Sequence, residues 1–253
     1  MGLAVQKMFD GIAKRYDFLN HFLSLGRDLA WRKKASQGLE GFQKSRNYSK
    51  GRVVLDLCGG TGDFWKIWCD QNRSSTLQNE FGIIADFSLP MLKEAQKKIA
   101  QEVKITDQGS NNKVRIKTAL VRMDALHPCF KSNTFDIILC GYGMRNLDSV
   151  EKGISEINKI LKPGGTFTTL EFFRPTTLFT KLFYRGFAPI CIPFIGWIFS
   201  SKRDAYEYLI QSIQKFSSVK EYSLIFQRFN FGKISIIACD FGISHIVKAE
   251  KRL

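Results

Sequence analysis

A carboxylate followed by a glycine-rich turn is the first feature of the sequence that could do chemistry. The run Val53-Val-Leu-Asp56-Leu-Cys-Gly59-Gly60-Thr61-Gly62-Asp63 leads from an apolar stretch into closely spaced glycines. Glycine lets the backbone approach a ligand, and the first amide groups of a following helix can bind it. Asp86 lies 24 residues beyond Gly62, at the end of the next apolar run. A carboxylate there can accept both ribose hydroxyls, so the spacing predicts a site for an adenine nucleoside.

Two cofactors with an adenine nucleoside fit this spacing, NAD and S-adenosylmethionine. The dinucleotide fingerprint G-x-G-x-x-G is absent, because Gly60-Thr-Gly62 is followed by Asp63-Phe-Trp65. Asp56 before the turn suits a cofactor with a cationic amine and no pyrophosphate to repel. Asp124 follows the third strand-like run, where it would accept a hydrogen bond from the adenine amine or cap a turn. The pattern favours S-adenosylmethionine.

The elements that position these residues alternate between strand-like and helical runs. We predict strands over 52–57, 81–85, 114–123, 135–140 and 166–171, helices over 64–69, 89–103 and 150–161, and a polar loop over 106–112. Runs 233–239 and 244–249 predict a final hairpin that adds one antiparallel strand. Because this alternation is typical of doubly wound sheets, we predict an α/β, Rossmann-like fold with a mostly parallel seven-stranded sheet.

Helical patterns flank this core on both sides. Residues 3–25 place apolar side chains at three- and four-residue steps, and 29–39 form a second such pattern, which predicts an N-terminal helical cap over 1–50. We assign the cap to the same domain as the cofactor-binding core over 51–253. An aromatic-rich helical insertion is expected at about 176–216.

The net charge of +15 is concentrated at the two ends of the chain. Residues 1–50 and 176–253 each carry an excess of six positive charges, whereas 51–175 carry an excess of three. Nucleic acid, an anionic membrane surface or simple solubility would each explain basic ends. The six cysteines form no C-x-x-C pair, which argues against a zinc site or a disulfide framework and favours a reducing compartment. We expect no metal centre.

No targeting or membrane-spanning segment is predicted. The first ten residues do not read as a cleavable signal, and there is no presequence of the mitochondrial kind. The most apolar stretch, 186–200, is interrupted by Pro189 and Pro193 and is shorter than the roughly 20 residues that a spanning helix needs. We therefore expect a bacterial, cytoplasmic protein.

The sequence resembles the ubiquinone/menaquinone biosynthesis C-methyltransferase family over nearly its whole length. Similar motifs occur in the same order, and Gly141 departs from the family, which often has a cofactor-contacting Ser there. The matching runs are Tyr16-Asp-Phe-Leu-Asn20 through Trp31, Leu55 through Asp63, Gly143-Met-Arg145-Asn146-Leu-Asp148, Leu161-Lys-Pro-Gly-Gly165 through Phe172, Ala205 through Ser212, and Gly242 through His245.

The resemblance implies a class I S-adenosylmethionine-dependent methyltransferase acting on a ring carbon of demethylmenaquinol, or of the benzoquinol in ubiquinone synthesis. It implies that Thr61, Asp86, Asp124 and Ala125 bind the cofactor, beside Asp56 and Gly60 from the turn. Arg145 is the candidate for the chemical step, where it would stabilise a phenolate or hold a water that takes the proton. Tyr16 and Asn20 would orient the quinol. Candidate pocket residues are Phe172, Phe173, Phe179, Phe183, Tyr184, Phe187, Phe194 and Trp197.

The expected partners are a prenylated quinol and, transiently, an anionic membrane at the inner face of the cell membrane, with Phe194, Ile195 and Trp197 dipping into it. A homodimer is left open. Two rival functions are an RNA methyltransferase or RNA-binding module, and a non-catalytic scaffold. The first predicts aromatic residues interleaved with basic ones or an added domain, and neither is visible in the sequence. The intact turn argues against a scaffold, so we expect an enzyme without a nucleic-acid partner.

Overall fold

The computed structural model describes residues 2–39, 51–72, 80–109, 116–186 and 203–253. Within these ranges seven strands form one sheet in the order β3-β2-β1-β4-β5-β7-β6. Neighbouring strands are parallel except at β7, which runs antiparallel to β5 and β6. The predicted sheet and its reversed strand are thus confirmed. The strands are β1 Val53–Leu57, β2 Phe81–Asp86, β3 Lys117–Arg122, β4 Phe135–Gly141, β5 Leu161–Glu171, β6 Phe231–Cys239 and β7 Ser244–Lys251.

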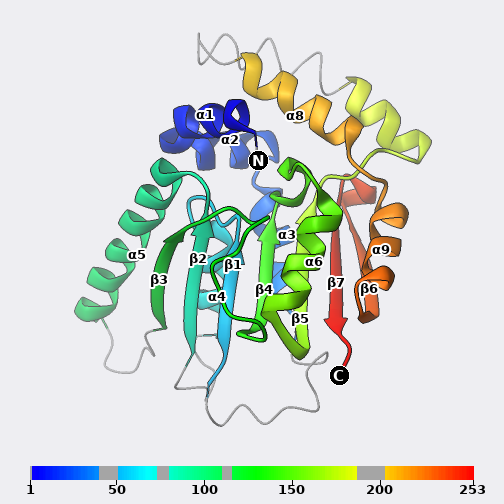
Figure 1. The fold of residues 1–253 in the computed structure, drawn as a ribbon. Helices are drawn as coiled ribbons and strands as arrows, with labels where there is room; N and C mark the ends of the chain where they lie inside the picture. Colours follow the sequence, from blue (N-terminus) through cyan, green and yellow to red (C-terminus); the bar gives the residue numbers. More distant parts are fainter. Residues whose placement is uncertain (1, 40–50, 73–79, 110–115, 187–202) are drawn as a thin grey trace.

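Helices cover both faces of the sheet, so each face has its own apolar core (Figure 1). On one face, residues of α3, α4 and α5 cluster with Val54, Ile137 and Leu170 of the strands. On the other, residues of α6 and α9 cluster with Leu55 and Phe167. The helices are α3 Arg27–Ser36, α4 Asp63–Asn72, α5 Leu89–Gly109, α6 Val150–Ile160 and α9 Val219–Arg228.

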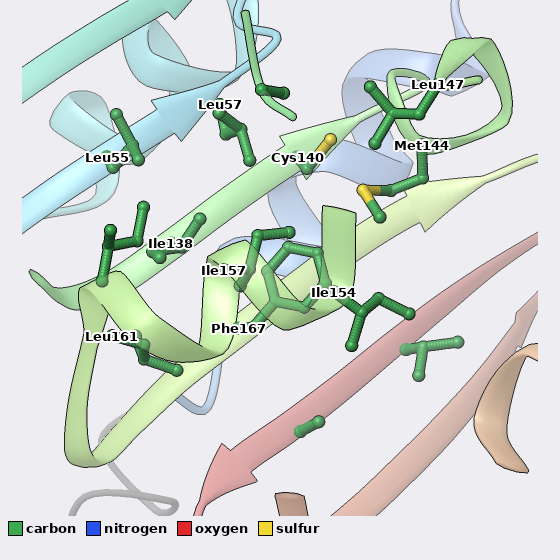
Figure 2. Close-up of a cluster of buried hydrophobic side chains, with 14 of the residues drawn as sticks. Leu55, Leu57, Ile138, Cys140, Met144, Leu147, Ile154, Ile157, Leu161 and Phe167 are labelled. Carbon is green, nitrogen blue, oxygen red and sulfur yellow. The ribbon is translucent and has the colours of Figure 1, made fainter. Parts of the chain in front are cut away.

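Figure 2 shows the second of these cores. The ring of Phe167 on β5 lies beneath Ile154 and Ile157 of α6, beside Ile138 of β4, and all four side chains are buried. The hydrophobic spacing of α6 causes this arrangement, since positions three and six residues apart along the helix face the sheet. The packing fixes β4 and β5 at the centre of the molecule, where their carboxyl ends border the site described below.

Short helices lie across the carboxyl end of the sheet. The N-terminal cap consists of α1 (Leu3–Ile12), η1 (Ala13–Arg15) and α2 (Tyr16–Leu23). In Figure 1 it lies over the carboxyl ends of the strands, with α8 (Arg203–Lys215) at the same end. Residues 178–186 are also helical. None of the helices in the described ranges has the length and apolar character of a membrane span.

Some predicted boundaries were wrong. The loop predicted over 106–112 is helical up to Gly109, because no Pro or Gly lies in α5 between Pro90, in its first turn, and that residue. Residues 110–112 lie outside the described residues. Strand β5 begins at Leu161, directly after α6, and the Pro-Gly-Gly turn is a bulge between the pairs Phe135↔Leu161 and Ile137↔Thr166. Helix α9 was not predicted, although Ser218 and Glu221 form the capping box that begins it.

Strand β7 carries a buried lysine near the middle of its length. Lys248 pairs with Thr168 of β5 and Ser235 of β6, and its ammonium group donates to the carbonyl of Gln37. Burial lowers the pKa of Lys248 to about 8. Since the unfolded chain holds this proton up to pH about 10.5, unfolding takes up a proton between these two values, and stability rises with pH across that window.

We predict that Lys248→Met removes this pH dependence. Wild-type protein should gain on the order of 1–2 kcal/mol of unfolding free energy between pH 8 and 10, less than the full pKa shift implies because solvent partly screens the charge. The variant should be at least as stable at pH 7 and show a flatter profile. Urea unfolding at several pH values measures this, with the exposed Lys220→Met as control. Equal slopes in the variant and the wild type would contradict the assignment.

Candidate functional site

A cavity of about 50 Å³, partly open to solvent, lies where the carboxyl ends of β1, β2 and β4 meet the N-terminal cap. Ligands of doubly wound sheets bind at this edge. The wall of the cavity is mostly apolar and includes a few polar side chains. Its lining residues are Phe9, Tyr16, Leu57, Cys58, Gly60, Ala85, Asp86, Phe87, Met91, Met123, Asp124, Ala125, Gly141, Tyr142, Gly143, Asn146 and Leu147.

The glycine turn after β1 is held against the end of β2. The Gly60 amide donates to Oδ2 of Asp86 at 2.9 Å, and the Gly59 amide donates to the carbonyl of Ala85 at 3.1 Å. A Cβ atom on Gly59 would lie 2.7 Å from Ile84, so the turn tolerates no side chain there. Gly60 has a φ of +55°, and no atom lies within 4 Å of its missing Cβ position. Because Gly60 has no side chain, the space beside it stays open to the cavity.

Asp86 has the environment of a ligand-binding carboxylate. Its Oδ1 accepts from the Ser88 amide at 2.8 Å while Oδ2 accepts from Gly60. Burial nevertheless raises the pKa of Asp86 to about 6. The ionised form is thus under-solvated when no ligand is bound, and further hydroxyl donors would stabilise it. Protonation should oppose the binding of such donors at pH below about 6.

Asp56 does not line the cavity, in contrast to the direct cofactor contact expected from the sequence. Its side chain is fully buried beneath the turn, where Oδ2 accepts from the Trp65 amide at 3.1 Å. Burial raises the pKa of Asp56 to about 7. The Asp56 carboxylate thus binds an amide in the first turn of α4 and thereby holds the end of the glycine turn in place.

Thr61 is also turned away from the cavity, because its hydroxyl donates to Oδ1 of Asp17 in the cap at 2.5 Å. The other carboxylate oxygen of Asp17 pairs with Lys98 of α5 at 2.6 Å, and Lys98 also pairs with Asp63 at 2.5 Å. These four side chains join the cap, the glycine turn and α5. A second polar contact, from the Ser88 hydroxyl to Asp10 of α1 at 2.5 Å, anchors the cap beside Asp86.

Asp124 and Ala125 border the cavity after β3. Asp124 accepts from the Leu126 amide at 3.0 Å and lies 3.1 Å from Nδ1 of His127. Burial opposes ionisation of Asp124, but these hydrogen bonds outweigh it and hold its pKa below the usual value. The turn-capping role weighed in the sequence analysis is therefore present, and it leaves the carboxylate ionised at the cavity wall.

Arg145 is buried but does not line the cavity. Its Nη1 donates to Oε1 of Glu171 at 2.5 Å and to the carbonyl of Tyr142 at 2.9 Å. Its guanidinium carbon lies 5.8 Å from the ring centres of Tyr142 and Phe172. The partner is thus Glu171, fully buried at the end of β5, and not the surface carboxylate Asp148. The sequence could not reveal this pair, because its two members lie 26 residues apart.

Tyr16 lines the cavity, and Asn20 lies one turn further along α2. Burial raises the pKa of Tyr16, against the opposing effects of Arg32, the Asn20 side chain and Arg145. The Asn20 amide nitrogen is buried without a hydrogen bond in the described structure. Both positions match the expectation that the first helices cover the site, and Tyr16 alone reaches the cavity wall.

Most of the apolar wall was not predicted, because Phe9, Phe87 and Met91 line the cavity. The aromatic residues proposed for a pocket that takes the isoprenoid tail are a separate set. Its described members lie outside this cavity wall; Phe173, for example, packs on Phe216 and Tyr222. Phe187, Phe194 and Trp197 lie outside the described residues. Phe87 could have been predicted from its position, because it directly follows Asp86, the carboxylate at the end of β2.

Gly141, which departs from the family pattern, is explained by a neighbouring cation. A Cβ atom at this position would lie 2.8 Å from Nη1 of Arg32 and 3.0 Å from Phe64. Arg32 is buried, 5.2 Å from the ring centre of Tyr142 and 3.7 Å from Asp28. The guanidinium therefore occupies the volume that a serine side chain would need.

Proteins of known structure share this architecture. A SAM-dependent methyltransferase from Aquifex aeolicus superposes with a TM-score of 0.52 over 84% of this chain and 89% of its own, at 14% identity. The CMeT domain of the citrinin polyketide synthase gives a TM-score of 0.59 over 88% of this chain and 52% of its own, at 15% identity. These likenesses confirm the class I methyltransferase fold.

Relatives of similar length carry one name. Demethylmenaquinone methyltransferases from Bacteroides fragilis and Desulfitobacterium hafniense are 33% and 34% identical, each over 98% of this chain and over 92% and 89% of their own lengths. The model of the ubiE/COQ5 methyltransferase family matches residues 2–251. With the fold, this supports an enzyme that uses S-adenosylmethionine as its methyl donor. The chain belongs to the ubiE/COQ5 methyltransferase family.

Proposed function

We propose that this chain methylates a ring carbon of demethylmenaquinol with S-adenosylmethionine, producing menaquinol, S-adenosylhomocysteine and the proton that leaves the ring carbon. The observation that carries the proposal is a cavity at the carboxyl end of the sheet, with Asp86 and the glycine turn on one side and cap residues on the other. Relatives at about one-third identity bear the matching name. Their shared name favours the menaquinol acceptor over the ubiquinone-pathway benzoquinol.

The residues present fit the proposed donor. Asp86 would accept the ribose hydroxyls, because its carboxylate is at the cavity and lacks full solvation. Gly60 would let the methionine portion approach the backbone, and Asp124 with Ala125 would border the adenine. Phe87 and Met91 supply apolar contacts for the base. When bound, S-adenosylmethionine supplies an electrophilic methyl group on a sulfonium.

The acceptor must lose a hydroxyl proton so that electron density reaches the ring carbon. No residue of the described cavity wall is a histidine or lysine, so a water molecule is the proposed proton carrier. Arg145 would favour the phenolate electrostatically, and Glu171 holds its guanidinium in place. Tyr16 and Asn146 would orient the quinol hydroxyls; Asn146 is itself held by Tyr208 at 2.9 Å.

The proposed substrate also indicates where in the cell the enzyme works. A prenylated quinol resides in the bilayer, so the proposed enzyme works at the inner face of the bacterial cell membrane as a peripheral protein. Basic ends would assist by attraction to anionic lipids. Neither nucleic acid nor a second subunit is required by this proposal, and a homodimer stays a matter for measurement.

Methyl transfer from labelled S-adenosylmethionine to a short-tailed demethylmenaquinol tests the function directly. We expect label in the quinol product and slower transfer to the corresponding ubiquinone-pathway benzoquinol. Preferential labelling of the benzoquinol would move the enzyme to the other pathway. Labelling of neither quinol, with label transferred to RNA instead, would overturn the proposal.

We predict that Asp86→Asn weakens S-adenosylmethionine binding by about 1–3 kcal/mol, because a charged hydrogen-bond acceptor is lost. Wild-type affinity should fall as the pH drops below about 6, since Asp86 must ionise to accept both hydroxyls. Calorimetry at pH 5.5 and 7.5 measures both effects. Glu156→Gln on α6 is the control and should bind normally; an Asp86→Asn protein with wild-type affinity would remove this residue from the site.

We predict that Arg145→Lys lowers kcat by about 10²-fold or more while S-adenosylmethionine affinity changes little. Lysine keeps a positive charge beside Glu171, whereas Arg145→Met would leave that carboxylate buried and unpaired at a cost of about 3–5 kcal/mol. Single-turnover rates and calorimetry separate the two effects. Arg228→Lys on α9 serves as control. Near-normal turnover of Arg145→Lys would leave Arg145 with a structural role only.

A further inference from the structure

Two large apolar side chains protrude from backbone that disfavours them. Leu25, between α2 and α3, is 87% exposed, and Phe241, in the turn between β6 and β7, is 84% exposed. Both have left-handed backbone, with φ of 51° and 59°. Glycine or asparagine is more stable in that conformation, and a polar residue is more soluble. Neither folding nor solubility therefore explains a Leu and a Phe at these positions.

The two side chains belong to one face of the molecule. Arg27, two residues after Leu25, pairs with Asp240, which directly precedes Phe241, at 2.7 and 2.5 Å. The ring of Phe241 lies 5.5 Å from that of Phe179, on the helix over 178–186. We call this the apolar rim. Its exposed apolar members are Leu25, Leu178, Phe179, Leu182 and Phe241.

The apolar rim lies at the same edge of the sheet as the cavity. Strand β7 is antiparallel to both β5 and β6, so β6 runs in the direction of β5. The turn after β6, η4 (Asp240–Gly242), therefore lies at the carboxyl edge, where the glycine turn and the cap also lie. A flat partner touching the rim would contact the molecule on the side where the cavity opens.

Positive charge lies beside the apolar rim. Lys181 and Arg185 are exposed on the helix that carries Leu178 and Leu182. Lys34 of α3 is also exposed and lies within electrostatic range of Asp240. The described acidic residues on the same stretches are already engaged. Asp17 pairs with Lys98, Asp28 lies against His21 and Arg32, and Asp240 binds Arg27.

We propose that the apolar rim docks the protein on an anionic phospholipid bilayer. This rests on the proposed function, because a prenylated quinol must be collected from a bilayer. Apolar side chains flanked by basic ones fit such a surface, because the former enter the interface and the latter attract anionic headgroups. A second copy of the chain fits poorly, since two cationic faces would repel.

The double variant Leu25→Asn/Phe241→Asn tests the surface. Asparagine suits left-handed backbone, so the fold should be kept and the melting temperature unchanged or higher. We expect wild-type protein to sediment with phosphatidylglycerol-containing vesicles at low salt, to be released at high salt, and to ignore phosphatidylcholine vesicles. The double variant should bind the anionic vesicles at least tenfold more weakly. Leu224→Asn, on the exposed side of α9, is the matched control.

Methyl transfer separates this inference from the proposed function. With a short-tailed, soluble demethylmenaquinol the double variant should match wild type, whereas with a long-tailed quinol in vesicles its rate should fall several-fold. If wild type methylates neither quinol, the proposed function fails, and sedimentation still decides the docking surface. Unchanged vesicle binding by the double variant would overturn the inference. So would a dimeric wild type that the double variant makes monomeric, which would assign the rim to self-association.

Discussion

The hydrogen bond from the Gly60 amide to the Asp86 carboxylate extends the pairing of β1 and β2 beyond the sheet, into the turn that follows β1. Through it, the turn after β1 takes its shape from β2, and Gly59 must be glycine because Ile84 occupies the adjoining space. The same carboxylate accepts from Ser88 at the start of the next helix. One acidic residue thus fixes the cavity floor and is also the residue proposed above to accept the ribose hydroxyls of the donor.

The cap depends on this arrangement in turn. Thr61, within the glycine turn, holds Asp17, and Ser88, just beyond Asp86, holds Asp10. Both anchors of the cap are therefore on the two turns that meet at the cavity floor. Any displacement of these turns would also shift Phe9 and Tyr16 in the cavity wall. Two side-chain hydrogen bonds, Thr61 to Asp17 and Ser88 to Asp10, therefore couple the position of the cap to that of the two turns.

Much of the fold follows from local sequence patterns. The apolar runs of β1, β2 and β4 and the periodicity of α6 identify a parallel sheet, and the spacing of Asp56, the glycines and Asp86 locates its cofactor edge. What could not be predicted depends on contacts between distant residues. The direction of the Thr61 hydroxyl depends on Asp17 of the cap, and the partner of Arg145 is on another strand. Asp56 is at the predicted position in the sequence, but its side chain is buried beneath the glycine turn.

The position of β7 constrains how the chain can be made. Strand β7 lies between β5 and β6, so β6 has no neighbour in the sheet until β7 has inserted. During translation, β1 to β5 can pair as they leave the ribosome. The backbone N–H and C=O groups of β6 stay unpaired until β7 is made. The 72 residues 172–243 separate the paired strands β5 and β7, and closing such a long loop is slow. Until synthesis passes residue 251, α9 has only part of its packing surface, and the exposed β5 edge is where a chaperone would act.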